Sequence, residues 1–193
     1  MHKTRLEAFS DAVIAIIMTI MVLELRVPEG ADFAALQSIM PVFLAYVMSF
    51  VYLAIYWNNH HHLLHTADHV DGRILWSNMI MLFWLSLVPF ATAWMEQEHF
   101  AALPVSVYGV VLFLAGVSYH ALVLGIIRHH GPHSLLASAV GQNWKGRLSL
   151  LAYLIAIWSA FMNVGISIGL YVLVTLVWFV PDRRIERKVR HEH

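Results

Sequence analysis

The stretch Arg5-Leu6-Glu7-Ala8-Phe9-Ser10-Asp11-Ala12 decides the fold, because it places charged and hydroxyl groups directly before a long apolar run. That run, from Val13 to Leu23, contains one polar side chain, Thr19. An ionised group at the edge of the hydrocarbon is expensive and is usually retained for a function or a fixed contact. We therefore predict that this stretch opens a membrane-spanning helix and that its polar groups bond to each other or to a neighbouring helix.

The composition is that of an integral membrane protein. Of the 193 residues, 60% are hydrophobic and only 12% are charged, which is about half the charged fraction of an ordinary soluble domain. The absence of cysteine excludes disulfides, thiolate metal sites and thiol catalysis. The first apolar run ends in Glu24-Leu25-Arg26 and shows no small-residue cleavage pattern, so we expect a retained anchor rather than a cleaved signal.

The hydropathy pattern predicts an all-α membrane protein with six transmembrane helices in a single domain, residues 1–193. Crossing a 30 Å hydrocarbon layer takes roughly 20 residues, and the last two segments are shorter than that. Asn163 and Gly165 mark the expected turn between those two, Pro89 is expected to kink the third, and Asp32 to Met40 is a candidate surface helix. The six segments lie near residues 10–25, 41–57, 74–95, 105–127, 148–161 and 166–180.

The basic residues predict the orientation. With six spans, every lysine and arginine except Arg26 falls on the same side of the membrane. The positive-inside rule then places both termini in the cytoplasm of a multi-pass protein of the cell membrane. The outer loops carry acidic residues, which either attract cations or are simply solvated. They are Glu24, Glu29, Asp32, Glu96 and Glu98.

One face of the first helix carries an apolar stripe. At roughly 100° per residue, Ile16, Ile20 and Leu23 fall within about 60° of one another, and Thr19 flanks them. The pair Ser10–Asp11 points more than about 100° away from the stripe on the same helical wheel. Periodicity alone favours ordinary core or lipid-facing residues for this stripe, with a pore lining as the alternative.

Several motifs in this sequence resemble the transmembrane protein 175 family of potassium channels. The first is Arg5-x-x-x-Phe9-Ser10-Asp11 at the head of the first span. The run 56–65, the segment from Val70-Asp71-Gly72-Arg73 through 87–94, and the run 181–186 are also similar to bacterial members. In order and spacing these motifs cover nearly the whole chain.

The resemblance implies a homotetrameric channel whose pore is lined by the first helix of each subunit. Such a channel conducts potassium and other monovalent cations passively across the lipid bilayer, needs no cofactor, and uses no Thr-Val-Gly-Tyr-Gly filter. That filter sequence is absent here. The resemblance places the pore constriction at Ile16, with further layers at Ile20 and Leu23, and assigns selectivity to Thr19 together with Ile16. A narrow ring of isoleucines would block flow by losing its water, which makes it a hydrophobic gate.

Thr19 has a second interpretation, in which its hydroxyl simply bonds back to a carbonyl of its own helix. The resemblance further implies that polar residues of neighbouring helices hold the opening motif in a structural network. Asn58 is a further candidate partner, and the sequence does not determine the pairs. The residues assigned to this network are Arg5, Phe9, Ser10, Asp11, Trp57, His60, His61 and Asn78.

The 13 histidines raise the alternative of a secondary transporter or metal-ion carrier that uses the histidine-rich cytoplasmic end of the second span. His61 and His65 stand four apart on a helix, a spacing that can hold zinc. A cluster of interfacial histidines that hydrogen-bond and titrate is the simpler interpretation, and we assign no metal site. His129, His130 and His133 form a second such cluster.

Two further classes of function do not fit the sequence. An intramembrane hydrolase needs a nucleophile and a base that meet at depth, whereas Ser118 and His120 lie on different helix faces, so the chain is not expected to be an enzyme. Nucleic-acid binding is not expected, because the predicted spans leave no room for a fold that performs it. The basic tail from Arg183 to Arg190 is interpreted as a topology anchor that contacts anionic lipid.

Overall fold

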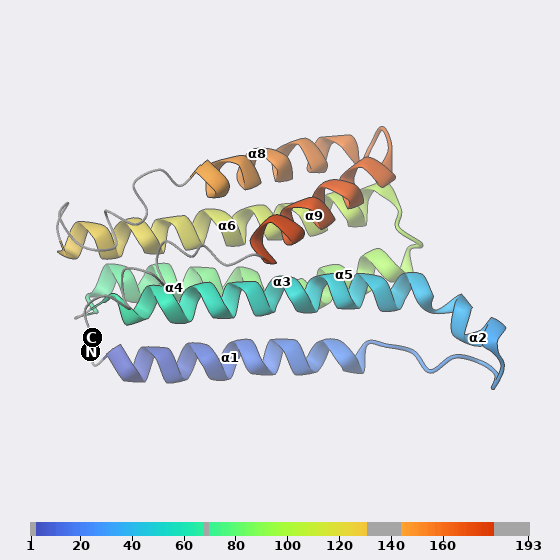
Figure 1. Ribbon diagram of the computed structural model, residues 1–193, viewed down its shortest axis with the longest axis horizontal. Helices are drawn as coiled ribbons and strands as arrows, with labels where there is room; N and C mark the ends of the chain where they lie inside the picture. Colours follow the sequence, from blue (N-terminus) through green and yellow to red (C-terminus); the bar gives the residue numbers. More distant parts are fainter. Residues whose placement is uncertain (1–2, 68–69, 131–143, 180–193) are drawn as a thin grey trace.

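The computed structural model describes residues 3–67, 70–130 and 144–179, and every regular element within these ranges is a helix (Figure 1). The all-α prediction is therefore confirmed for the described part of the chain. In chain order the helices are α1 (Lys3–Leu23), α2 (Phe33–Ser38), α3 (Met40–His65), α4 (Gly72–Ser86), α5 (Val88–Gln97), α6 (Ala102–His130), α8 (Trp144–Ser159) and α9 (Val164–Phe179).

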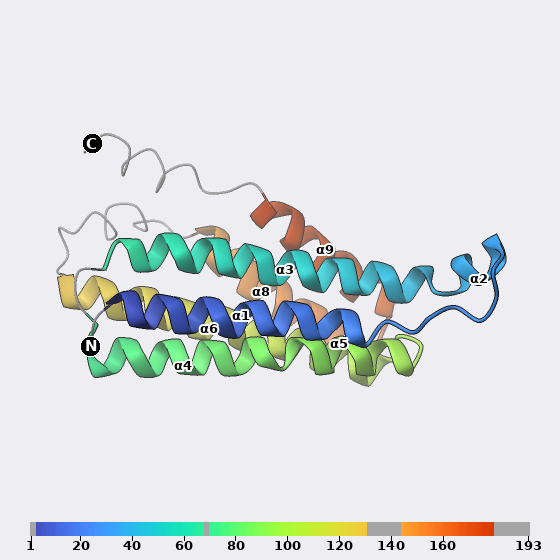
Figure 2. The ribbon, with the colours of Figure 1, turned by 90° about the horizontal axis from the view of Figure 1, so that it is seen from below.

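The long helices run side by side along one axis and form a bundle. Helix α1 lies between α3 and α4 and contacts both (Figure 2). Helix α6 packs against α4 and α5 on one side and against α8 on the other. The hairpin of α8 and α9 lies on the side of the bundle opposite α1 (Figure 1). Helix α1 is thus a peripheral helix of the single chain, and much of its surface is left uncovered.

Among the described residues, four helical stretches are long and apolar enough to cross a membrane: Lys3–Leu23, Met40–His65, Gly72–Gln97 and Ala102–His129. Helices α8 and α9 have 16 residues each, so each extends for about 24 Å, less than the thickness of the hydrocarbon layer. The structure thus supports a membrane protein with several apolar helices. The count of six spans stays a prediction.

The local signals in the loops are confirmed. The third predicted span is interrupted at Leu87, between α4 and α5, and Pro89 occupies the first turn of α5, where its missing N–H costs no helical bond. Asp32 caps α2 by accepting a hydrogen bond from the Ala35 backbone N–H at 2.9 Å. In the turn between α8 and α9, the Asn163 side chain accepts the Gly165 N–H at 2.9 Å.

The first two spans begin or end outside their predicted limits. Helix α1 starts at Lys3, so the polar motif lies inside the helix, and α3 continues to His65, through the whole histidine-rich run. A hydropathy window ends a span where polar residues begin. Here the helices continue past those residues, and two of the polar side chains, Lys3 and His60, bond to neighbouring helices.

Candidate functional site

Helix α1 has two distinct faces. The face toward the bundle is buried and consists of Leu6, Ser10, Ile14, Ile17 and Met21. On the other face, the side chains of Ile16, Ile20 and Leu23 are 56%, 43% and 79% exposed. The stripe identified from the helical wheel is therefore the surface that the chain leaves uncovered.

An open groove runs along the exposed face of α1. Ile16, Ile20 and Glu24 lie along one wall of the groove, and Phe90 and Trp94 of α5 lie along the opposite wall. The groove is thus apolar over most of its length and has a carboxylate where α1 ends. It brings the stripe of α1 together with the outer half of the interrupted third span.

Thr19 is exposed beside this stripe. Its hydroxyl lies 3.0 Å from the Ala15 carbonyl oxygen and 2.9 Å from that of Ile16, so it donates to the backbone of its own helix. A bonded hydroxyl still presents oxygen lone pairs to its surroundings. The back-bonded geometry therefore leaves Thr19 able to accept a contact from a cation or from its water.

A buried chain of hydrogen bonds connects α1, α4 and α3. The Ser10 hydroxyl donates to the Leu6 carbonyl at 2.9 Å and accepts from the Asn78 amide nitrogen, also at 2.9 Å. The Asn78 amide oxygen lies 2.7 Å from Nε2 of His60, and because that oxygen can only accept, the imidazole donates. The three side chains are at most 1% exposed. Because each polar group is satisfied, the chain fixes the rotation of α1 about its axis.

Asp11 has a separate partner on α3. Its Oδ1 atom accepts the indole N–H of Trp57 at 2.9 Å. The Trp57 ring stacks on His61 with 6.0 Å between ring centroids, and His61 meets His65 edge-on at 4.6 Å. The ammonium of Lys3 donates to the His65 carbonyl at 3.0 Å. The histidine-rich end of α3 is thus packed along the first turns of α1.

Two of the residues assigned to the network stand apart from it. Within the described ranges, the guanidinium of Arg5 is exposed and has no hydrogen bond or ion pair, and Phe9 is 46% exposed. Sequence reasoning missed Glu7, whose Oε1 atom is buried among the described residues without a hydrogen-bond partner. The helical wheel could have identified Glu7, since it lies on the same face as Ser10 and Asp11.

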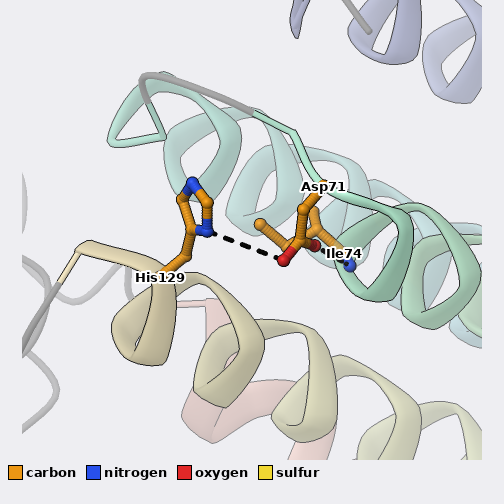
Figure 3. Close-up of polar contacts among 3 residues, drawn as sticks. All are labelled: Asp71, Ile74 and His129. Atoms are coloured by element: carbon orange, nitrogen blue, oxygen red, sulfur yellow. Dashed lines mark hydrogen bonds and ion pairs between the residues drawn. The ribbon is translucent and has the colours of Figure 1, made fainter.

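One histidine of the second cluster lies beside a carboxylate. Asp71 caps α4 by accepting the Ile74 backbone N–H at 2.8 Å, and its other oxygen lies 3.6 Å from Nδ1 of His129 (Figure 3). The Ile74 N–H lowers the pKa of Asp71, and the nearby His129 lowers it further. His133 and the side chain of His130 lie outside the described residues. In the ranges that the structure describes, no group of three or more metal-binding side chains gathers.

Comparisons with known proteins identify the family. The family model described as endosomal/lysosomal potassium channel TMEM175 matches residues 5–89. A protein of Chryseobacterium sp. named a potassium channel is 51% identical, over 98% of this chain and 99% of its own length. A protein of Danio rerio named an endosomal/lysosomal proton channel TMEM175 is 25% identical, over 92% of this chain and 36% of its own length.

The fold matches a solved structure of the same family. The crystal structure of a homolog of the lysosomal potassium-selective channel TMEM175, from Chamaesiphon minutus, superposes with a TM-score of 0.82. That protein is 26% identical to this chain, and the match covers 93% of this chain and 97% of that one. Sequence and fold agree along nearly the full length, and the chain belongs to the TMEM175 family, whose members are ion channels and not enzymes.

Proposed function

We propose that this chain is a potassium-permeable cation channel of the cell membrane, assembled as a homotetramer with four α1 helices around a central pore. Potassium is the permeant ion, and no cofactor takes part. The observation that carries the proposal is the exposed apolar stripe Ile16, Ile20 and Leu23 on a helix whose other face is hydrogen-bonded into the bundle. The names of the relatives support potassium as the ion.

The fixed rotation of α1 favours a pore role over a role in contacting lipid. Lipid tails accept any apolar face, so a helix that only meets lipid needs no fixed rotation. Here Ser10 and Asp11 bond to two other helices and hold the stripe in one direction. A pore lining requires this, because a rotation of one residue position, about 100°, would remove the stripe from the axis.

The stripe acts as a hydrophobic gate in this proposal. Four copies of Ile16 form a ring that offers no ligand to replace the water around an ion, so a narrow ring is dry and closed. Widening lets hydrated cations pass. Ile20 and Leu23 add further apolar layers, and Thr19 supplies four hydroxyl oxygens one turn away that favour a cation.

The same proposal includes six spans with both termini in the cytoplasm. Helices α1 and α8 begin, and α3 and α6 end, at the same end of the bundle (Figure 1). Among the described residues, this end carries Lys3, Arg5, Arg73, Arg128, Lys145 and Arg147, whereas Arg26 alone follows the opposite end of α1. Such segregation of positive charge is typical of a cytoplasmic face.

The test is ion flux into liposomes that contain the purified full-length chain, with potassium, sodium and proton gradients applied in parallel. We expect passive potassium flux that exceeds sodium flux and increases in Ile16→Asn, because the amide would hydrate the constriction. Proton flux without potassium flux would instead favour the activity in the name of the Danio rerio relative. Flux that saturates and requires a counter-ion would favour the carrier alternative.

The oligomeric state has its own measurement. Light scattering of the detergent-solubilised chain, corrected for bound detergent, should give four times the 22.0 kDa mass of one subunit. A monomer that nevertheless conducts would contradict a pore made from four α1 helices.

A further inference from the structure

The groove between α1 and α5 lies on the side of the bundle where α1 is uncovered (Figure 2). It has a volume of about 740 Å³ that the described residues of one subunit leave unfilled. It is lined from α1 by Val13 and Ile17 as well as by two residues of the stripe, and from α5 by Phe90 and Trp94. Large exposed apolar surfaces of this kind mark sites where another protein or lipid binds.

The other flank of α1 carries a run of small side chains. Ala8, Ala12 and Ala15 are exposed, and on the helical wheel they fall within about 60° of one another. This alanine ridge lies about 75° from the centre of the stripe on one side, and Val13 and Ile17 of the groove lie a similar angle away on the other side. In membranes, small side chains on a helix let the backbone of a second helix come close.

A ring of four α1 helices would bring these two flanks together. With fourfold symmetry, the two neighbours of each helix lie about 45° to either side of the direction of the axis. When the stripe points to the axis, one neighbour therefore lies beside the alanine ridge and the other lies beside the groove. A ring of Ile16 side chains that is narrow enough to be dry requires close neighbours, with helix axes about 8–10 Å apart as in ordinary helix packing. The alanines permit this approach.

We propose that the groove between α1 and α5 binds the alanine ridge of α1 from the neighbouring subunit. The inference rests on the proposed homotetramer and assigns its interface. Each contact joins the ridge of one subunit to the groove of the next, so it is head-to-tail, and four such contacts close the ring. Phe90, which is 61% exposed in the single chain, is covered by this contact.

The charges at the outer end of α1 fit the same arrangement. Glu24 lines the groove where α1 ends, and Arg26 follows two residues later and is exposed. Within the described ranges Arg26 has no ion pair. Four α1 helices around one axis are parallel and level, so Arg26 of one subunit lies at the height of Glu24 of the next. Opposite charges at this height favour docking of a second subunit, whereas a lipid chain in the groove would leave the carboxylate without a cation.

Disulfide trapping in the purified full-length protein tests the contact, because the chain has no cysteine of its own. On the helical wheel, Ala12 and Val13 lie about 50° from the centre of the stripe on opposite sides. The double variant Ala12→Cys/Val13→Cys therefore places one thiol on each flank at nearly the same height. Packed helices bring facing Cα atoms within reach of a disulfide, so mild oxidation should give covalent dimers, trimers and tetramers on a denaturing gel. The two single variants are the matched controls and should stay monomeric on the same gel.

A larger side chain on the ridge tests the same contact without oxidation. Ala12→Leu should raise the concentration at which the tetramer dissociates in detergent about tenfold, because the added atoms hold the two helices apart. The measurement is light scattering across a dilution series. Ala121→Leu is the matched control, since Ala121 is an exposed alanine of α6 that does not line the groove.

The outcomes separate this interface from the proposed function. A monomeric wild type would overturn the homotetramer and the docking together. A tetrameric wild type would overturn the docking alone in three cases: the cysteine pair gives no covalent tetramer, the single variants cross-link as well as the pair, or Ala12→Leu dissociates no more readily than Ala121→Leu. The groove would then be left to lipid.

Discussion

The two faces of α1 differ in the contacts that they make with the rest of the protein. On the inner face, Ser10 and Asp11 bond to side chains of α4 and α3, and Ile14 is fully buried. On the outer face, Ile16 and Leu23 meet little of their own chain. The direction of the exposed face therefore follows from contacts made on the opposite one. Substitutions on the two faces should accordingly separate into effects on stability and effects on conduction.

The sharpest test of this separation is the pair Ile14→Asn and Ile16→Asn. At Ile14 the amide would be buried without partners, which costs about 3 kcal/mol, so we expect loss of the folded protein after mild heating, measured by size-exclusion chromatography. At Ile16 the same amide stays exposed, so the protein should survive heating and conduct potassium severalfold faster in liposomes. Equal loss of folded protein in both variants would contradict the division into two faces.

The central residue of the buried hydrogen-bond chain should give the next largest effect. Asn78→Ala removes two hydrogen bonds and leaves Ser10 and His60 each short of a partner, which should cost about 2 kcal/mol. The measurement is the melting temperature in detergent. Asn58→Ala is the control, since no hydrogen bond of the Asn58 side chain occurs among the described residues. A melting temperature that falls equally in both variants would mean that the buried hydrogen bonds of Asn78 do not anchor α1.

A smaller loss of stability is expected when the bond between Trp57 and Asp11, the second contact that anchors α1, is removed. Trp57→Phe keeps an aromatic ring but loses the bond to Asp11, so stability should fall by about 1 kcal/mol. Trp76→Phe serves as the control, because Trp76 is 69% exposed and makes no hydrogen bond within the described ranges. Chemical unfolding of both variants checks the difference.

On the exposed face, Thr19→Val should leave stability unchanged, since the lost hydroxyl bonds only to its own helix. The potassium-to-sodium flux ratio in liposomes should fall a few-fold, because an apolar methyl replaces the oxygen beside the stripe. An unchanged potassium-to-sodium flux ratio would mean that the Thr19 hydroxyl only bonds to its own backbone and has no part in selectivity.

The smallest effect concerns the start of α4. Because the native pKa of Asp71 is lowered, its ionised form stabilises the fold above the ordinary pKa of an aspartate. This contribution is lost as the pH falls through the lowered value, below about pH 4. The melting temperature of wild type should therefore fall more steeply in this range than that of Asp71→Asn. If the melting temperatures of the two proteins fall in parallel with pH, the Asp71 carboxylate does not stabilise the fold.

The sequence was sufficient for much of α1 but not for its partners. Helical spacing located the stripe and placed Ser10 and Asp11 away from it, because both depend only on the period of one helix. The pairs Asn78–Ser10 and Trp57–Asp11 depend on how three helices are rotated and shifted against one another, which the spacing within one helix does not determine. Arg5 shows the opposite limit. Its charge and its place in the motif led us to predict a bonding partner, and the described structure contains none.

The lengths of the helices show a similar limit. Hydropathy ended the second predicted span at Trp57, whereas α3 continues to His65, where the Lys3 ammonium of α1 donates to the His65 carbonyl. The close packing of α6 against α8 had no signal in the sequence. It depends on Gly116 of α6, where a Cβ atom would lie 3.0 Å from a Leu150 methyl carbon.

The interruption at Leu87 divides the third span into two mechanical parts. The inner segment is anchored through Asn78 to α1 and α3, whereas the outer segment carries Phe90 and Trp94 on the groove wall opposite Ile20. The outer segment has an anchor of its own, since the Thr92 hydroxyl lies 2.9 Å from that of Ser49 on α3, and Ala91 and Met95 are fully buried. The two halves of this stretch are thus held at different points of α3, the inner half through His60 and the outer half through Ser49.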